Sequence, residues 1–131
     1  MEKTKFIELK QVFKTLLGPK GCLWDKKQTH QSLLGGLREE TRELIQAIKS
    51  EDFNHIKEEL GDVLLHVMFH SQIASQEKEF NIEDVIDGLI KKLKRRHPHV
   101  FGKTKVKSSA QVVRNWNQIK AKEKKKRAGN G

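Results

Sequence analysis

The chain has 131 residues, of which 35% are hydrophobic and 34% are charged, and its net charge is +10. This length suits one domain, the single cysteine (Cys22) excludes an intramolecular disulfide, and no apolar run is long enough for a signal peptide or a membrane span. We therefore expect a cytoplasmic protein without a membrane segment, whose small apolar share favours a core completed by a second copy.

Five helices are predicted from apolar residues that recur at helical spacing. Asp52 is expected to cap the third helix, Ser108 or Ser109 the fifth, and Pro98 to stop the fourth. No strand pattern of useful length appears, so the expected class is an all-α helical bundle. The predicted ranges are 3–17, 28–32 to about 49, 53–77, 82–96 and 110–124, with loops over 22–27 and 97–107.

The second and third expected helices have long apolar stripes. Gly35-Gly36 interrupts the second helix, at roughly 1 kcal/mol per glycine relative to alanine, unless another group approaches closely there. The residues expected to face inward are Leu33, Leu37, Leu44 and Ile48 on the second helix, and Phe53, Ile56, Leu60, Val63, Leu64, Val67 and Ala74 on the third.

Charge is unevenly distributed along the chain. Residues 1–90 carry 12 Lys/Arg and 16 Asp/Glu, whereas residues 91–131 carry 15 Lys/Arg and one acid, Glu123. The stretch 91–107 has eight Lys/Arg and no acid, which favours an anionic ligand. We predict one domain over 1–124 and a basic, disordered tail over 125–131.

Four carboxylates form two pairs at i, i+3 spacing, one pair on each of two neighbouring helices. Glu40 and Glu43 lie near the edge of one apolar stripe, and Glu59 and Asp62 flank the other. Residues three apart share a helix face, so adjacent helices would gather all four acids. Clustered anions repel unless a hard cation such as Mg²⁺ or Mn²⁺ takes their oxygens as ligands. Either pair alone fits surface charge, but together they predict a metal site.

Other polar residues extend this pattern. His66 and His70 continue the face of Glu59, but we expect them to be packed histidines, because a di-iron bundle would use Glu-x-x-His from two helices. Lys92 and Arg96 share one helix face, and Trp116 and Lys120 share another. A tryptophan ring with nearby cations suits a nucleobase and its phosphates. A core tryptophan beside solvated cations fits the same spacing, and composition does not decide between them.

Five segments resemble one known family. They are 21–30 (GCLWDKKQTH), 37–44 (LREETREL), 58–65 (EELGDVLL), 95–102 (RRHPHVFG) and 115–120 (NWNQIK). In combination they are similar to the MazG nucleoside triphosphate pyrophosphohydrolases, over about residues 6–124. Leu23 stands where that family usually has proline, so we expect a less rigid loop before Trp24.

The resemblance implies an all-α fold in which two subunits pair, as a homodimer or a dimer of dimers. It implies Mg²⁺-dependent hydrolysis of NTPs or dNTPs to the monophosphate and pyrophosphate, as nucleotide-pool house-cleaning. Glu39 or Glu40 would orient or deprotonate the attacking water. Matched residue by residue, the metal ligands are Glu40, Glu43, Glu59 and Asp62, and the nucleotide-binding residues are Glu39, Glu58, Lys92, Arg96, Trp116 and Lys120.

Two other functions fit parts of the pattern. A nucleic-acid-binding module using residues 91–131 would bind in a salt-sensitive manner, but it leaves the four acids unexplained. Weak RNA binding by the basic tail is compatible with catalysis. A relative specialised for phosphoribosyl-ATP would share the carboxylates but not the segment at 95–102.

Overall fold

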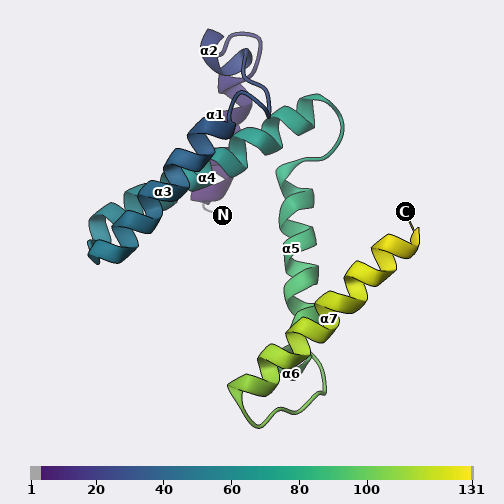
Figure 1. Cartoon of the computed structure of the whole chain (residues 1–131). Helices are drawn as coiled ribbons and strands as arrows, with labels where there is room; N and C mark the ends of the chain where they lie inside the picture. Colours follow the sequence, from purple (N-terminus) through teal and green to yellow (C-terminus); the bar gives the residue numbers. More distant parts are fainter. Residues whose placement is uncertain (1–3, 131) are drawn as a thin grey trace. The chain divides into compact units, whose positions relative to one another are not determined.

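The computed structural model describes residues 4–130. Within that range every regular element is an α-helix, which confirms the predicted all-α class (Figure 1). The third and fourth predicted helices match the structure to within one residue. The elements are α1 (Lys5–Leu16), α2 (Leu23–Lys26), α3 (Leu34–Ser50), α4 (Phe53–Gln76), α5 (Ile82–Arg96), α6 (Pro98–Phe101) and α7 (Ser109–Asn130).

The structure differs from the prediction in three larger respects. The second expected helix begins only at Leu34, because a turn precedes it. The backbone N–H of Thr29 donates to the Ser32 hydroxyl at 2.8 Å, and the backbone N–H of Ser32 donates to the Thr29 hydroxyl at 3.0 Å. The expected loops contain the short helices α2 and α6. The last helix continues to Asn130 instead of ending near Lys124, since its Lys, Ala and Arg residues are good helix formers. The division into a domain over 1–124 and a tail over 125–131 stays a prediction.

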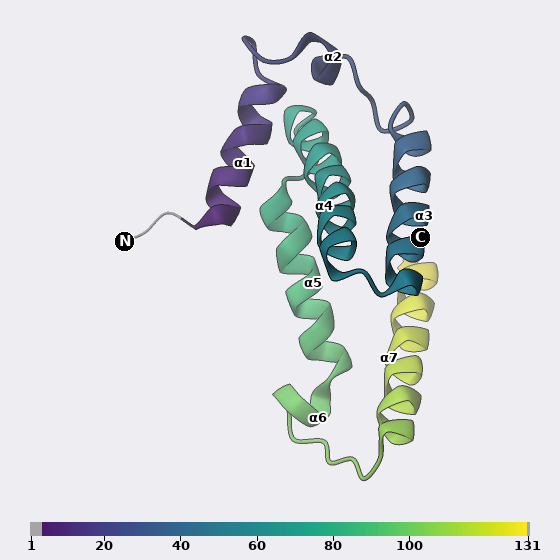
Figure 2. The same cartoon turned by 90° about the vertical axis from the view of Figure 1, so that its left-hand side faces the viewer.

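The chain divides into two compact units, which part between Ile82 and Glu83. In the first unit α4 lies between α1 and α3 (Figure 2). Phe13 of α1 meets Phe69 of α4 edge to face, with ring centroids 5.9 Å apart. Such aromatic pairs add to the stabilisation from apolar burial. The buried apolar cluster consists of Phe13, Leu17, Leu33, Met68, Phe69 and Ile73.

Side-chain caps fix two helix starts as predicted. Asp52 accepts a hydrogen bond from the His55 backbone N–H at 3.3 Å and begins α4. Ser108, not Ser109, caps α7, because its hydroxyl accepts from the Gln111 backbone N–H at 3.2 Å.

Gly36 allows α3 and α4 to approach closely. A Cβ at this position would lie 3.1 Å from His66 Cε1 on α4, closer than most side-chain contacts. At Gly35 a Cβ would meet nothing within 4 Å. The glycine pair is therefore required for packing at one of its two positions, which accounts for a residue that is unfavourable within a helix.

The apolar stripe predicted for α4 is largely wrong. Phe53, Leu60, Leu64 and Val67 are exposed in the chain, and the buried apolar residues of α4 are Met68, Phe69, Ile73 and Ala74. The helix is apolar on two faces, and only its C-terminal half covers the core of this unit. The remaining face stays open to contact with another surface.

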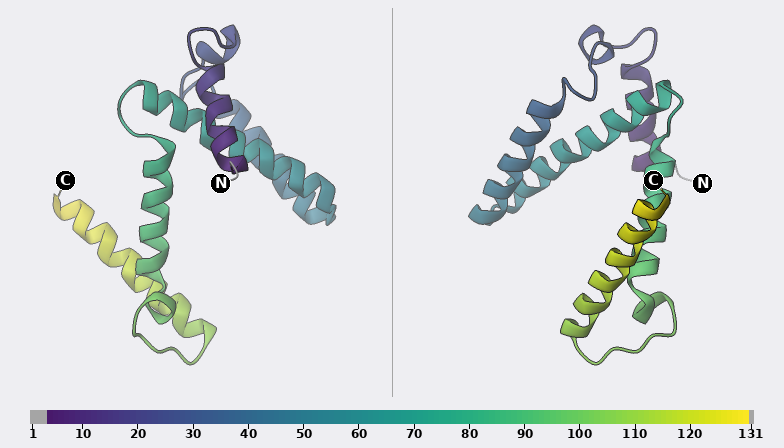
Figure 3. Two further views of the ribbon diagram at one scale, coloured as in Figure 1. Left: turned by 180° about the vertical axis from the view of Figure 1, so that it is seen from behind. Right: turned by 45° about the vertical axis from the view of Figure 1, so that its right-hand side comes forward.

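The second unit comprises most of α5 together with α6 and α7. Here α7 passes the C-terminal end of α5 (Figure 3), where Arg95 and Arg96 form ion pairs with Glu123. Across residues 4–130, no helix combines the length and apolarity that crossing a membrane requires.

Neighbouring residues on α1 provide a test of the core. Phe13 is 6% exposed and Val12 is 46% exposed. We expect Phe13→Ala to lower the free energy of unfolding by about 3–5 kcal/mol, because it removes a buried ring and leaves a cavity. Val12→Ala is the matched control and should cost less than about 1 kcal/mol. Equal losses in urea unfolding of the two variants would contradict this core.

Candidate functional site

The contact between α3 and α4 places carboxylates where packed helices usually have apolar side chains. Gly36, Glu40, Glu43 and Ala47 follow one another at helical spacing, Ala47 is fully buried, and Gly36 meets His66 of α4. This face of α3 therefore lies against α4. Glu40 and Glu43, predicted at the edge of an apolar stripe, lie on this face.

Three of the four predicted ligands come together in a carboxylate cluster of Glu40, Glu43 and Glu59. One oxygen from each can be chosen so that all three lie within 4.8 Å of one another. Asp62 does not join this group, but its charge raises the pKa of Glu40 and Glu59, so it acts on the same place. The arrangement supplies three carboxylate oxygens at one point, with a fourth acid nearby.

The cluster holds protons more tightly than isolated carboxyl groups do. Burial, followed by the charges of Asp62 and Glu43 and by contact with Glu59, raises the pKa of Glu40 from 4.5 to about 7. Burial is also the first cause that raises the pKa of Glu59, and a hydrogen bond with Glu40 offsets part of this. Desolvation and like charges both disfavour the ionised form.

Two oxygens of the cluster are buried without a hydrogen-bond partner, Oε2 of Glu40 and Oε2 of Glu59. The other oxygen of Glu59 lies 3.2 Å from Nε2 of His55, one helical turn earlier. Buried polar atoms normally have partners, so these oxygens call for a ligand. Several carboxylate oxygens meeting at one point are the donor set that Mg²⁺ and Mn²⁺ prefer, and the residues therefore fit such an ion.

The remaining predicted residues of the first unit lie outside the cluster. Glu39 and Glu58 are exposed. His70 is a packed histidine: its Nδ1 lies 2.7 Å from Nδ1 of His30, and the two rings stack. His66 is buried against Gly36. Both histidines are thus packed, although Nδ1 of His66 and Nε2 of His70 are buried without a hydrogen-bond partner.

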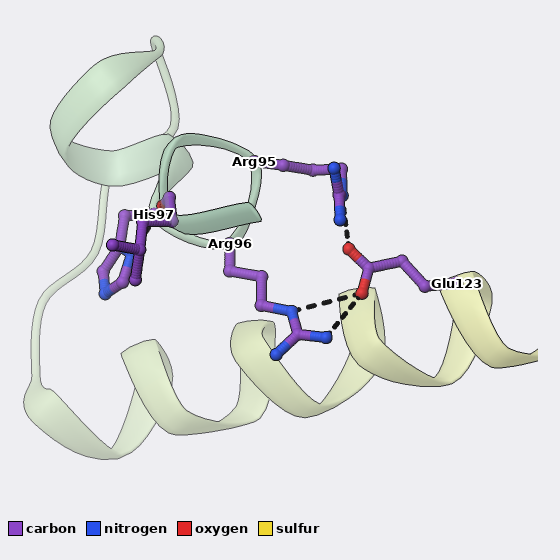
Figure 4. Close-up of polar contacts among 5 residues, drawn as sticks. Arg95, Arg96, His97 and Glu123 are labelled. Atoms are coloured by element: carbon purple, nitrogen blue, oxygen red, sulfur yellow. Dashed lines mark hydrogen bonds and ion pairs between the residues drawn. The ribbon is translucent and has the colours of Figure 1, made fainter. Parts of the chain in front are cut away.

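In the second unit, α5 and α7 form a basic groove of about 490 Å³. Glu123 accepts hydrogen bonds there from Arg95 and Arg96 (Figure 4). Predicted Lys92 and Arg96 both line the groove, whereas Lys120 is exposed and outside its lining. The lining residues are Lys92, Arg95, Arg96, Glu123, Lys126 and Arg127.

Trp116 is covered by neighbours within this unit. The Arg96 guanidinium carbon lies 5.1 Å from the centroid of the Trp116 ring, and the His97 ring meets it edge-on with centroids 5.1 Å apart. His97 in turn lies with Nδ1 2.6 Å from the Leu93 carbonyl oxygen, which makes it part of a structural turn. The role of Trp116 in stacking a nucleobase stays a prediction.

Several residues of these sites were not singled out from the sequence as members of a site. His55 stands four residues before Glu59, a helical spacing that could have identified it. Glu123 is the one acid of residues 91–131, and a single acid among so many cations could have indicated an ion pair. Arg95, Lys126 and Arg127 were hidden in a run of cations, where composition does not show which side chains meet.

Known proteins match this chain over most of its length. The model of the MazG nucleotide pyrophosphohydrolase domain matches residues 28–101. A Thermotoga maritima protein named nucleoside triphosphate pyrophosphohydrolase/pyrophosphatase MazG is 52% identical over 93% of this chain and 46% of its own length. An uncharacterised Bacillus subtilis protein, YabN, is 51% identical over 92% of this chain and 24% of its own length. The chain thus spans between about a quarter and half of these relatives.

A solved structure is similar as well. The crystal structure of a MazG-related protein from Thermotoga maritima has a TM-score of 0.68 and 26% identity with this chain. The match covers 86% of this chain and 96% of that one.

The raised pKa of Glu40 makes the stability of the metal-free protein depend on pH. Because its pKa rises from 4.5 to about 7, the folded state holds a proton that the unfolded chain releases. Its stabilising contribution is full below the unfolded pKa and is lost as pH rises through the folded pKa. We therefore expect Glu40→Gln in EDTA to melt above wild type at about pH 8 and close to it at about pH 5.

Glu39→Gln is the control, since this neighbour is exposed and outside the cluster. Its effect on the melting temperature should be small at both pH values. Identical melting of wild type and Glu40→Gln at the higher pH would show that ionisation of Glu40 in the folded protein carries no such penalty.

Proposed function

The chain belongs to the MazG nucleotide pyrophosphohydrolase family, and we propose that it hydrolyses nucleoside triphosphates, with ribose or deoxyribose, to the monophosphate and pyrophosphate. The observation that carries this proposal is the carboxylate cluster, in which three acids meet within 4.8 Å and two buried oxygens have no partner. A nucleic-acid-binding role for residues 91–131 would leave this cluster without a purpose. The substrate class and a house-cleaning role in the cytoplasm are part of the proposal.

Glu40, Glu43 and Glu59, with Asp62 beside them, would hold Mg²⁺ or Mn²⁺. Such an ion supplies charge neutralisation for phosphate oxygens and makes water a stronger acid. Binding would release the proton that Glu40 retains near neutral pH, since a carboxyl group must ionise to act as a ligand. In the metal-free protein, the raised pKa of Glu40 therefore reflects the free energy needed to hold these ligands close together.

The water that attacks an internal phosphorus needs a base to take its proton. Glu40 lies in the cluster, and Glu39 is next to it and exposed, so one of them can orient or deprotonate that water. The phosphoanhydride bond between the α- and β-phosphates breaks, and the leaving group is pyrophosphate. Glu58, which is exposed and next to Glu59 in sequence, would contact the nucleotide from the edge of the cluster.

Cations of the second unit would bind the phosphates of the substrate. Lys92 and Arg96 line the basic groove, and their charges would offset those on the leaving pyrophosphate. Lys120 would add a further cation. Trp116 would contact the base through its ring, which favours weak base selectivity because every base has a π-face.

We also propose that the chain works as a homodimer, or as a dimer of dimers. On α4, Phe53, Leu60, Leu64 and Val67 are each exposed although they share one helix face. Four large apolar side chains in one stripe are typical of a protein–protein contact. A second copy would bury this stripe and complete the core that a short chain lacks.

Separation of the products tests the reaction. With Mg²⁺ and a panel of NTPs and dNTPs, we expect the monophosphate and pyrophosphate. Glu43→Ala and Asp62→Ala should each lower kcat at least about 100-fold, because loss of one acid weakens metal binding and misplaces the rest. Glu79→Ala, which removes an exposed acid away from the cluster, should keep wild-type activity.

Release of orthophosphate without pyrophosphate would contradict the proposed chemistry. Full activity in Glu43→Ala and Asp62→Ala would instead exclude the cluster as the site and leave the reaction itself open to another assignment.

Sedimentation tests the proposed dimer. We expect a mass about twice the 15.2 kDa of one chain, and Leu64→Glu should shift it to the single-chain mass by placing a charge in the contact. Val12→Glu changes an exposed apolar residue of α1 and should leave the mass unchanged. A single-chain mass for wild type at micromolar concentration would refute the dimer.

A further inference from the structure

Glu123 is an acidic residue surrounded by basic side chains. It is the one acid among residues 91–131, and it lies in the lining of a groove with five cations. Its two oxygens accept from three donors: Nε of Arg95, and Nε and Nη2 of Arg96, the last two at 3.1 and 2.7 Å. The carboxylate therefore occupies one whole side of the Arg96 guanidinium.

The burial of these side chains makes the contact more than a surface ion pair. The side chains of Arg96 and Glu123 are only 10% and 17% exposed. Hydrogen bonds from Arg96, and then from Arg95, lower the pKa of Glu123 to about 2, so it is ionised throughout the physiological range. Paired and charge-assisted contacts of this kind are short and directional.

The groove keeps a strong positive charge despite this carboxylate. Lys92, Lys126 and Arg127 line it in addition to the two arginines, so one acid faces five cations. Both Arg96 donors share Oε2 of Glu123, and Arg95 bonds Oε1, so the two oxygens of one carboxylate bridge two guanidinium groups. Two oxygens of a phosphate group can bridge a pair of guanidinium groups in the same way. The arrangement that Glu123 imposes on Arg95 and Arg96 is thus one that a phosphate group would also satisfy.

We propose that Glu123 is a resident anion, which occupies Arg95 and Arg96 in the absence of substrate and is displaced by the pyrophosphate portion of a nucleoside triphosphate. This inference rests on the proposed function and assigns Arg95 and Glu123 to it. Arg95 becomes a phosphate-binding residue, and Glu123 becomes an internal competitor of the ligand. Its competition lowers affinity for pyrophosphate, which favours release of that product.

Calorimetric titration of inorganic pyrophosphate into the full chain, without divalent metal, tests this directly. We expect Glu123→Gln to bind pyrophosphate about three- to tenfold more tightly than wild type, because a competing charge a few ångströms from the ligand is removed. Asp87→Asn is the matched control: it removes an exposed acid of α5, which pairs with Lys91, and should change affinity less than about twofold.

Glu123→Asp separates displacement from net charge. It keeps the charge but is one methylene shorter, so it should hold the two arginines less well and bind pyrophosphate more tightly than wild type. Should Glu123→Gln fail to fold, as judged by circular dichroism, this variant carries the test. Affinity equal to or weaker than wild type in the folded variants would overturn the proposal.

A short single-stranded RNA serves as a second probe. If Glu123→Gln tightened RNA binding but not pyrophosphate binding, the groove would be a nucleic-acid site and the proposal would be wrong. The triphosphate assay on wild type keeps the two hypotheses apart. If wild type hydrolyses triphosphates but Glu123→Gln does not change pyrophosphate binding, only the inference about Glu123 is refuted. If Glu123→Gln binds pyrophosphate more tightly but wild type is inactive, only the proposed reaction is refuted.

Discussion

The burial of several carboxylates side by side between α3 and α4 is the constraint on which the rest of the first unit depends. Gly36 against His66 and the fully buried Ala47 let the two helices pack closely, and this packing brings the acids within 4.8 Å of one another. Burial, and then the charges of the neighbouring acids, raise the pKa of Glu40 to about 7, so that a proton offsets part of the charge when no cation is bound. The same contact that folds the chain thus costs stability until a ligand arrives, a pattern typical of functional sites.

In the second unit, clustered positive charges are partly neutralised by a carboxylate of the same unit. Cations gather along α5 and α7, and Glu123 satisfies the two most closely placed arginines. In the first unit the cluster has oxygens without partners, whereas here a side chain of the protein takes the place that a ligand could fill. The first unit therefore gathers carboxylates at one point, and the second gathers guanidinium and ammonium groups along one groove.

Helical spacing and capping predicted much of the fold, because both are local. The cap of α4 at Asp52 and the bounds of α5 can be predicted from residues that are close in sequence. The apolar face of α4 was misassigned, since a helix that is apolar on two sides does not reveal which side meets the core. For the site, spacing predicted that Glu40, Glu43 and Glu59 would meet, but Asp62 stands slightly apart. The pairing of Arg96 with Glu123 could not be predicted, because it joins residues that are far apart in sequence within a run of similar charges.

The central claim is that the carboxylate cluster binds a divalent cation, and a crystal grown with Mn²⁺ tests it most directly. The anomalous difference map should show one or more Mn²⁺ ions at about 2–2.3 Å from oxygens of Glu40, Glu43 and Glu59, distances typical of small divalent ions bound to oxygen. A map with no peak at this cluster, at a Mn²⁺ concentration that supports hydrolysis, would contradict the claim.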